Sequence, residues 1–179
     1  MGLFSKILGG KEGGLGVYAE IAEIASNGDL YVIELMDQCI SDREGFLEQY
    51  AYRYDGWQTD IRALSHEKLC VIVLCEELCR SGSMCIVEAN EMLPGFIDKV
   101  SQLKRYYEFG IDLNTADLRP TDDPADWSKK YDSLLDDDII FSRFDTGSGN
   151  FDLLYLEKND HERISRLLKD NTALRLYRC

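Results

Sequence analysis

The feature that most restricts the fold of this chain is a pair of strand-like segments on either side of a short glycine-containing turn. Residues 139–145 read IIFSRFD and residues 151–157 read FDLLYLE, two runs rich in aromatic and branched side chains. The link between them, TGSGN at 146–150, has the length and the glycines of a β-hairpin connection. We therefore predict an antiparallel pair of strands here, and hence a sheet in the second half of the chain.

The segments around this hairpin complete the order β-α-β-β-α-β. The short apolar run MCIVEA at 84–89 predicts a central strand, and residues 91–109 have the apolar spacing of a helix. After the hairpin, a helix is predicted at 160–170 and a last strand at 172–179. This order is that of a ferredoxin-like split βαβ arrangement, which predicts a four-stranded sheet with two helices on one face and right-handed crossovers.

The first half of the chain is predicted to be helical. Helix-like segments occupy residues 16–26, 30–39, 41–52 and 65–80. We therefore expect an α+β fold in one domain, residues 16–179, in which a helical part (16–82) packs on a sheet-containing part (83–179). Residues 1–15 are expected to form a flexible N-terminal tail, with a weak membrane or partner anchor as the alternative.

The acidic composition restricts the class of ligand. The formal net charge is −13 and the pI is near 4.5, whereas nucleic-acid contacts need clustered Lys and Arg. We therefore expect no nucleic-acid partner, and we expect any charge-driven ligand to be a basic protein or a metal cation. No apolar run approaches the roughly 20 residues that span a bilayer, so stable membrane insertion is not expected.

Six cysteines without a secretion signal indicate reduced thiols in the cytoplasm. They are Cys39, Cys70, Cys75, Cys79, Cys85 and Cys179. No C-x2-C spacing occurs, and neither His66 nor His161 lies close enough in sequence to complete a usual zinc motif. Cys75 and Cys79, one helical turn apart, could share a ligand, but the apolar run around them favours buried thiols. We therefore predict neither a bound metal nor another cofactor.

Residues 112–138 form an acidic connector between the two halves of the predicted sheet. This segment contains nine aspartates and three basic residues, Arg119, Lys129 and Lys130, so its net charge is −6. No calcium-loop spacing is present, so a solvated loop is favoured over a metal site. The connector also holds Trp127 and Tyr131, and aromatic side chains often anchor interfaces. We therefore predict a protein-contact surface, with candidate binding residues Trp127, Tyr131, Asp136, Asp137 and Asp138.

The Asp-Thr-Gly-Ser sequence at 145–148 resembles the catalytic loop of pepsin-type aspartic proteases. Those enzymes need two such carboxylates and a downstream apolar-apolar-Gly segment, whereas this chain has no second Asp-Thr-Gly and no Gly after Gly149. A turn explains the same residues, because Asp145 can accept backbone N–H groups and the glycines supply positive φ. The polar tip, with Asp145, Ser148 and Asn150, is also a candidate binding site.

The segment IIFSRFDTGSGNFDLLYLEKNDHERISRLLK, residues 139–169, resembles the C-terminal part of a group of uncharacterised bacterial domains. In those domains a strand, a polar turn, an aromatic strand and a short helix close the chain. The segment resembles, more distantly, the SUKH superfamily of bacterial immunity proteins. The resemblance implies a small cytoplasmic bacterial protein of unknown or binding function, and not an enzyme with known catalytic residues.

The remaining motifs favour binding over catalysis. No Ser or Cys has nucleophile-elbow spacing, and neither a P-loop nor a dinucleotide-binding glycine pattern is present. We therefore expect a non-enzymatic protein–protein interaction module that acts through an acidic surface on an unidentified partner. One form of this expectation is an immunity-like protein. The alternative is a metal- or small-molecule-binding protein, or an enzyme, that uses the Asp-rich connector and the hairpin turn.

Overall fold

The computed structural model describes residues 14–54, 60–112, 115–171 and 173–179. Its elements follow in the order α1 (Gly16–Ala25), α2 (Leu30–Ser41), α3 (Arg43–Tyr50), η1 (Ala51–Tyr54), η2 (Ile61–Ala63), α4 (His66–Arg80), β1 (Cys85–Val87), α5 (Leu93–Ser101), α6 (Lys104–Glu108), η3 (Thr115–Asp117), α7 (Pro124–Asp132), β2 (Ile139–Asp145), β3 (Phe151–Glu157), α8 (Lys158–Leu167) and β4 (Arg175–Arg178). The predicted flexible tail lies, apart from its last two residues, outside the described residues.

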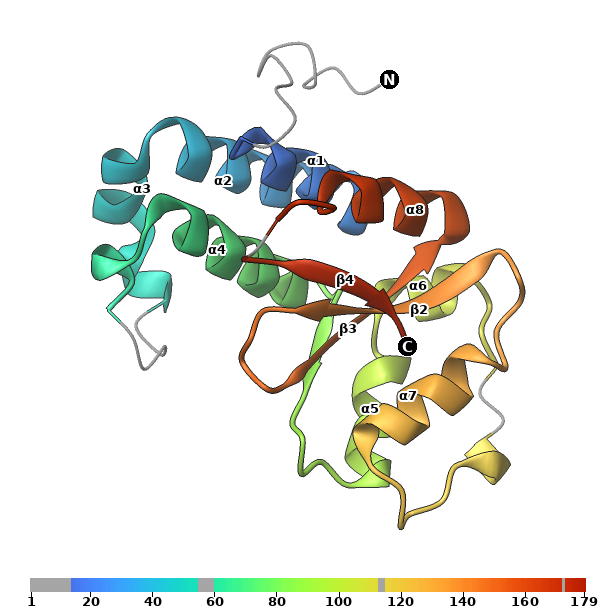
Figure 1. Cartoon of the computed structure of the whole chain (residues 1–179). Coiled ribbons are helices and arrows are strands. Elements are labelled where there is room, and N and C mark those ends of the chain that lie inside the picture. The colour runs from blue at the N-terminus through green and yellow to red at the C-terminus, as the bar shows by residue number, and fades with distance from the viewer. Residues whose placement is uncertain (1–13, 55–59, 113–114, 172) are drawn as a thin grey trace.

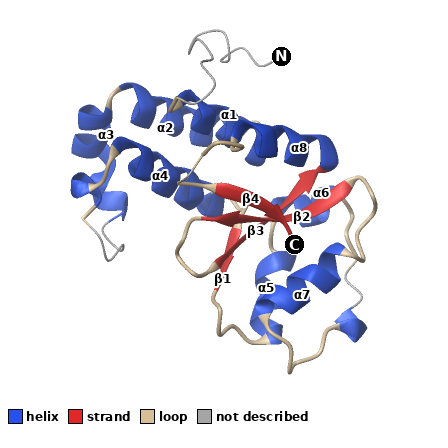
Figure 2. Ribbon diagram, in the orientation of Figure 1, coloured by secondary structure: helices blue, strands red, loops and turns tan. Residues whose placement is uncertain are grey.

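The predicted hairpin and the α+β class are confirmed. Strands β2 and β3 have the bounds expected from the sequence and pair antiparallel, with Phe141 opposite Tyr155 and Ser142 opposite Leu154. Figure 2 shows one sheet with helices around it, and four of the eight described α-helices, α1 to α4, precede the first strand. Within the described ranges, no helix is both long and apolar enough to cross a membrane.

The prediction of a helical first half is also confirmed, since α1 to α4 lie there. Local capping signals specify where two of these helices begin. The side chain of Asp29 accepts the backbone N–H groups of Tyr31 and Val32 at the start of α2. Ser65 Oγ accepts the N–H of Lys68 at 3.3 Å at the start of α4. These bonds satisfy N–H groups that have no partner within the helix.

The strand order differs from that of a ferredoxin-like sheet. The order is β1-β3-β2-β4 and all neighbours are antiparallel, so β4 pairs with β2, whereas a ferredoxin-like sheet has its last strand beside its first. The prediction that residues 84–89 form a central strand is therefore wrong, because β1 is an edge strand of three residues that pairs only with β3.

Helices cover both faces of the sheet, and the prediction of two helices on one face is also wrong. Figure 1 shows α1, α2, α4 and α8 on one side of the strands and α5 and α7 on the other. The strand order gives the physical reason. The connections from β1 to β2 and from β3 to β4 pass in the same direction across the sheet, although β1 and β3 run antiparallel. When two right-handed crossovers start from antiparallel strands and move in the same direction across a sheet, their helices lie on opposite faces.

Each face of the sheet buries a separate apolar core. Phe144, Leu154 and Leu156 point toward the layer of α1, α2, α4 and α8. Phe141, Leu153 and Tyr155 point the other way, toward the layer of α5, α6 and α7. This division follows from the alternation of side chains along a strand. A strand buried on both faces explains why FDLLYLE is almost continuously apolar.

Candidate functional site

The hairpin tip forms the turn expected from its sequence. The N–H of Gly147 donates to Asp145 Oδ1 at 3.0 Å, which is an Asx-turn, and Gly147 and Gly149 have φ values of 75° and 82°. Ser148 Oγ accepts the N–H of Asn150 at 3.2 Å. Asp145 and Ser148, two of the predicted binding residues, therefore have partners within the turn itself.

Trp127 and Tyr131 lie in the interior rather than at the exposed surface, although Tyr131 contributes to the lining of the hollow described below. Each is 1% exposed and belongs to the core beneath α5, α6 and α7. The indole N–H of Trp127 donates to the carbonyl of Arg119 at 2.8 Å, and the hydroxyl of Tyr155 lies 2.8 Å from that of Tyr131. Residues 124–132 form helix α7 rather than a solvated loop, so its aromatic side chains face the sheet.

Asp132 is buried as well and has a structural role. Its Oδ1 accepts the N–H of Phe141 at 2.8 Å, and its Oδ2 pairs with Arg178 at 2.5 Å. Part of the acidic connector is thus neutralised within the chain by the basic C-terminal segment.

The other aspartates of the connector stay at the surface. Asp136, Asp137 and Asp138 are exposed in the loop between α7 and β2. Backbone bonds hold this loop, since Ile139 N donates to the carbonyl of Asp136 and Lys158 N donates to that of Asp138, both at 2.9 Å. Among the described residues, no ion pair involves these three carboxylates or that of Asp112.

A hollow of about 180 Å³ opens between this loop and the turn that follows α6. Its lining consists of Phe109, Gly110, Ile111, Asp112, Tyr131, Leu134, Leu135, Asp136 and Ile139. The turn on one side depends on Gly110, whose φ is 62°. Leu134, on the other side, is 48% exposed.

The hollow combines an apolar wall with two exposed carboxylates. Asp112 and Asp136 come from its two sides, and Asp137 and Asp138 continue the negative charge along the loop. We call this feature the acidic-rimmed hollow, defined by residues 109–112 and 134–139. Of the predicted connector residues, Tyr131 and Asp136 line this hollow together with Leu134, Leu135 and Ile139, whereas Trp127 does not.

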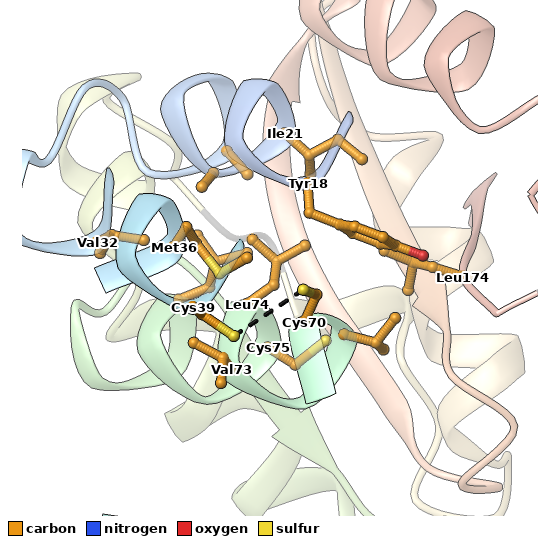
Figure 3. Close-up of a cluster of buried hydrophobic side chains, with 14 of the residues drawn as sticks. Tyr18, Ile21, Val32, Met36, Cys39, Cys70, Val73, Leu74, Cys75 and Leu174 are labelled. Atoms are coloured by element: carbon orange, nitrogen blue, oxygen red, sulfur yellow. Dashed lines mark hydrogen bonds between the residues drawn. The ribbon is translucent and has the colours of Figure 1, made fainter. Parts of the chain in front are cut away.

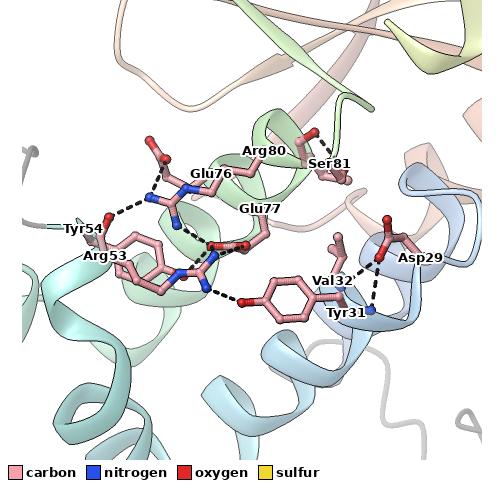
Figure 4. Close-up of polar contacts among 10 residues, drawn as sticks. Asp29, Tyr31, Val32, Arg53, Tyr54, Glu76, Glu77, Arg80 and Ser81 are labelled. Atoms are coloured by element: carbon pink, nitrogen blue, oxygen red, sulfur yellow. Dashed lines mark hydrogen bonds and ion pairs between the residues drawn. The ribbon is translucent and has the colours of Figure 1, made fainter.

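A buried glutamate forms a second polar cluster (Figure 4), which sequence reasoning missed. The side chain of Glu77, on α4, is 1% exposed. Arg53 Nη2 lies 3.1 and 2.9 Å from its two oxygens, Arg80 Nη1 lies 2.7 Å from Oε1, and the hydroxyl of Tyr54 donates to Oε1 at 2.9 Å. These contacts join η1 to α4, and they leave this carboxylate enclosed by its partners.

Ser142 and His161 form a third cluster. The ring Nδ1 of His161 lies 2.9 Å from Ser142 Oγ, but Ser142 is fully buried and so has no access to a substrate. His161 lies in the first turn of α8, and its ring is half-buried. Burial, and then the charge of Arg178, lower the pKa of His161, while Asp132 and Glu162 raise it less.

Three of the six cysteines, Cys39, Cys70 and Cys75, are buried, and the other three are partly buried. The fold brings two of the buried thiols together with a histidine. Cys39 on α2 and Cys70 on α4 are fully buried, with their sulfur atoms 3.9 Å apart (Figure 3). His66 precedes Cys70 by one helical turn, and its Nε2 lies 2.7 Å from the carbonyl of Cys39. The ligand atoms of these three residues lie within 4.8 Å of one another. Cys39 is 31 residues from Cys70, so no local motif could reveal this group.

Comparison with known proteins places the chain in one family. A family model described as Domain of unknown function (DUF6630) matches residues 17–174. No curated protein and no solved structure matches the chain. The match begins in α1 and ends just before β4, so it includes both helical layers and the acidic-rimmed hollow. It carries no link to the immunity proteins that the C-terminal segment resembles.

Proposed function

The chain belongs to the DUF6630 family of domains of unknown function, and we propose that it is a non-enzymatic protein-binding module whose contact surface is the acidic-rimmed hollow. The observation that carries this proposal is the pairing of an exposed leucine with four carboxylates that have no ion-pair partner among the described residues.

The chemistry of the rim favours a basic segment of a partner protein. A guanidinium can form two charge-assisted hydrogen bonds with one carboxylate, and its aliphatic stem can lie along an apolar wall. Asp112 and Asp136 supply the carboxylates, and Leu134 and Ile139 supply the wall. The net charge of −13 adds long-range attraction for a basic partner.

The size of the hollow favours one side chain over a metabolite. Pockets for small molecules measure roughly 300–1,000 Å³, whereas this hollow measures about 180 Å³. A protein interface can instead be anchored by a single arginine or lysine placed in such a hollow.

The other polar clusters support a function without catalysis. Glu77 is enclosed by two arginines and a tyrosine, and Ser142 is buried against His161. Asp145 and Ser148 hold the turn at the hairpin tip through hydrogen bonds within it. The alternative hypothesis of a metal- or small-molecule-binding protein uses this tip as a ligand site. These polar groups therefore have structural roles that explain their presence.

The proposal includes two further expectations. We expect the protein to act in the cytoplasm, where its thiols stay reduced. An immunity-like role is a specific form of the same proposal, in which the basic partner is a protein that the module neutralises.

The proposal can be tested by NMR titration of the labelled chain with two short peptides. One contains Leu-Arg-Leu, and the other replaces arginine by its neutral analogue citrulline. We expect the arginine peptide to shift the resonances of Leu134 and Ile139, which line the hollow. We expect the citrulline peptide to bind more weakly, because the charge-assisted bonds are lost.

Two double variants separate the hollow from general acidity. Asp136→Asn with Asp138→Asn should weaken binding about 2- to 30-fold, since each exposed charge pair contributes about 0.2–1 kcal/mol. Glu34→Gln with Glu48→Gln removes the same charge from exposed positions on α2 and α3 and should leave binding almost unchanged. Equal weakening by both pairs, or equal binding of both peptides, would show that the hollow is not a specific site.

A further inference from the structure

We propose that Cys39, His66 and Cys70 form a binding site for a divalent transition-metal ion, and that zinc fits it best. The site lies between α2 and α4, on the opposite side of the sheet from the acidic-rimmed hollow, so it is independent of the proposed function. Its three ligand atoms are within 4.8 Å of one another and come from residue types that bind zinc.

The separation of the two sulfur atoms matches tetrahedral zinc coordination. Zinc–sulfur bonds are about 2.3 Å long, so two thiolates on a tetrahedral ion lie about 3.8 Å apart. The sulfur atoms of Cys39 and Cys70 are 3.9 Å apart (Figure 3). An ion between them requires little change in the separation of the two sulfur atoms.

The hydrogen bond of His66 suits a metal ligand. Ring nitrogens that bind metal usually belong to an imidazole whose other N–H donates to a carbonyl or carboxylate. Nε2 of His66 lies 2.7 Å from the carbonyl of Cys39, so its N–H donates there and Nδ1 keeps its lone pair. This bond also ties the histidine to the helix that carries the first thiol.

Charge balance favours a divalent ion. Two thiolates and a neutral imidazole carry a charge of −2, so an ion of charge +2 makes the buried group neutral and avoids the cost of an unpaired charge. The thiolate is the metal ligand, so metal binding has to release the protons of both thiols.

The three residues leave one coordination position for a fourth ligand. Zinc sites with three protein ligands complete their coordination with water or a bound molecule. His66 is half-buried, whereas both thiols are fully buried, so the approach to this position passes the histidine side of the site.

The experiment is a titration of the reduced, metal-free chain with Co²⁺ and then Zn²⁺. We expect one equivalent of Co²⁺ to produce thiolate-to-cobalt charge-transfer absorption, and we expect Zn²⁺ to displace it. Cys39→Ala and Cys70→Ala should abolish this absorption. His66→Gln, which retains a donor for the carbonyl of Cys39, should weaken binding at least about tenfold.

A matched control is Cys75→Ala, which removes another buried sulfur from α4 at a position outside the group. This variant should bind Co²⁺ as the unaltered chain does. Circular dichroism shows whether each variant is folded, and at the same concentration Zn²⁺ should raise the melting temperature of the unaltered chain by more than that of His66→Gln. The proposal is overturned if the unaltered chain shows no thiolate absorption, or if Cys75→Ala loses it as fully as Cys39→Ala.

Discussion

Replacement of Glu77 by alanine is the sharpest test of how the helical half is held together. The change removes a buried carboxylate that accepts hydrogen bonds from Arg53, Arg80 and Tyr54 (Figure 4). It leaves two guanidinium groups and a hydroxyl group beside an apolar side chain. We expect a large loss of stability, because these groups lose their acceptor while remaining partly shielded from water.

The magnitude follows from the burial of each partner. Removing one member of a buried ion pair costs about 3–5 kcal/mol. The side chains of Arg53 and Arg80 are 20% and 36% exposed, so water can partly replace the lost carboxylate. We therefore expect a loss of about 3 kcal/mol in the free energy of unfolding, near the lower limit. For a chain of this size that corresponds to a fall of roughly 6–12 °C in melting temperature.

Urea unfolding followed by circular dichroism measures this loss, with Glu44→Ala as the matched control. Glu44 also pairs with an arginine, Arg43, at 2.6 Å, but its side chain is 81% exposed. Exposed pairs contribute about 0–1 kcal/mol, so this variant should stay close to the unaltered chain. If Glu77→Ala cost less than about 1 kcal/mol, or no more than Glu44→Ala, the reasoning from burial would be refuted.

Three further predictions concern single side chains. Tyr155→Phe removes a buried hydroxyl 2.8 Å from that of Tyr131 and should cost about 1–3 kcal/mol in urea unfolding, whereas Tyr177→Phe at an exposed position should cost little. The lowered pKa of His161 means that the unfolded chain binds its proton more readily, so this residue's contribution to stability is present above about pH 6.5 and is lost as the pH falls below it. The unfolding free energy should therefore fall as the pH drops through about 6.5, and it should fall less in His161→Gln. An NMR titration that gave this ring a pKa above the usual value would contradict the sign. Asp145→Ala removes the acceptor of the Asx-turn and should cost about 1 kcal/mol and speed amide exchange at the hairpin tip, and unchanged exchange would speak against this role.

The parts of the fold that could be predicted from the sequence depend on neighbours in the chain. Strands β2 and β3 were predicted with their observed bounds, because runs of aromatic and branched side chains and a glycine-containing turn are properties of adjacent residues. The cap of α4 at Ser65 follows from the same kind of local signal. The helix predicted at 91–109 is instead two helices, α5 and α6, separated at Gln102 and Leu103.

The candidate sites depend on contacts between distant residues, and sequence reasoning found them only in part. Asp136 was predicted at a contact surface and does line the acidic-rimmed hollow. Trp127 was predicted beside it, but the amphipathic helix α7 turns that side chain into the core. Its polar neighbours in the sequence gave no sign of which face would meet the sheet.

The sequence by itself determined the α+β class, the helical first half and the central hairpin, because these follow from periodicity, capping and turn residues within short windows. Only the tertiary structure decided which edge of the sheet receives β4, and hence that helices cover both faces. It also decided that Cys39, 31 residues before Cys70, meets that thiol and His66. The physical reason is that burial of apolar surface stabilises any arrangement that covers both faces of the sheet. Packing between the helices and strands determines which of these arrangements forms.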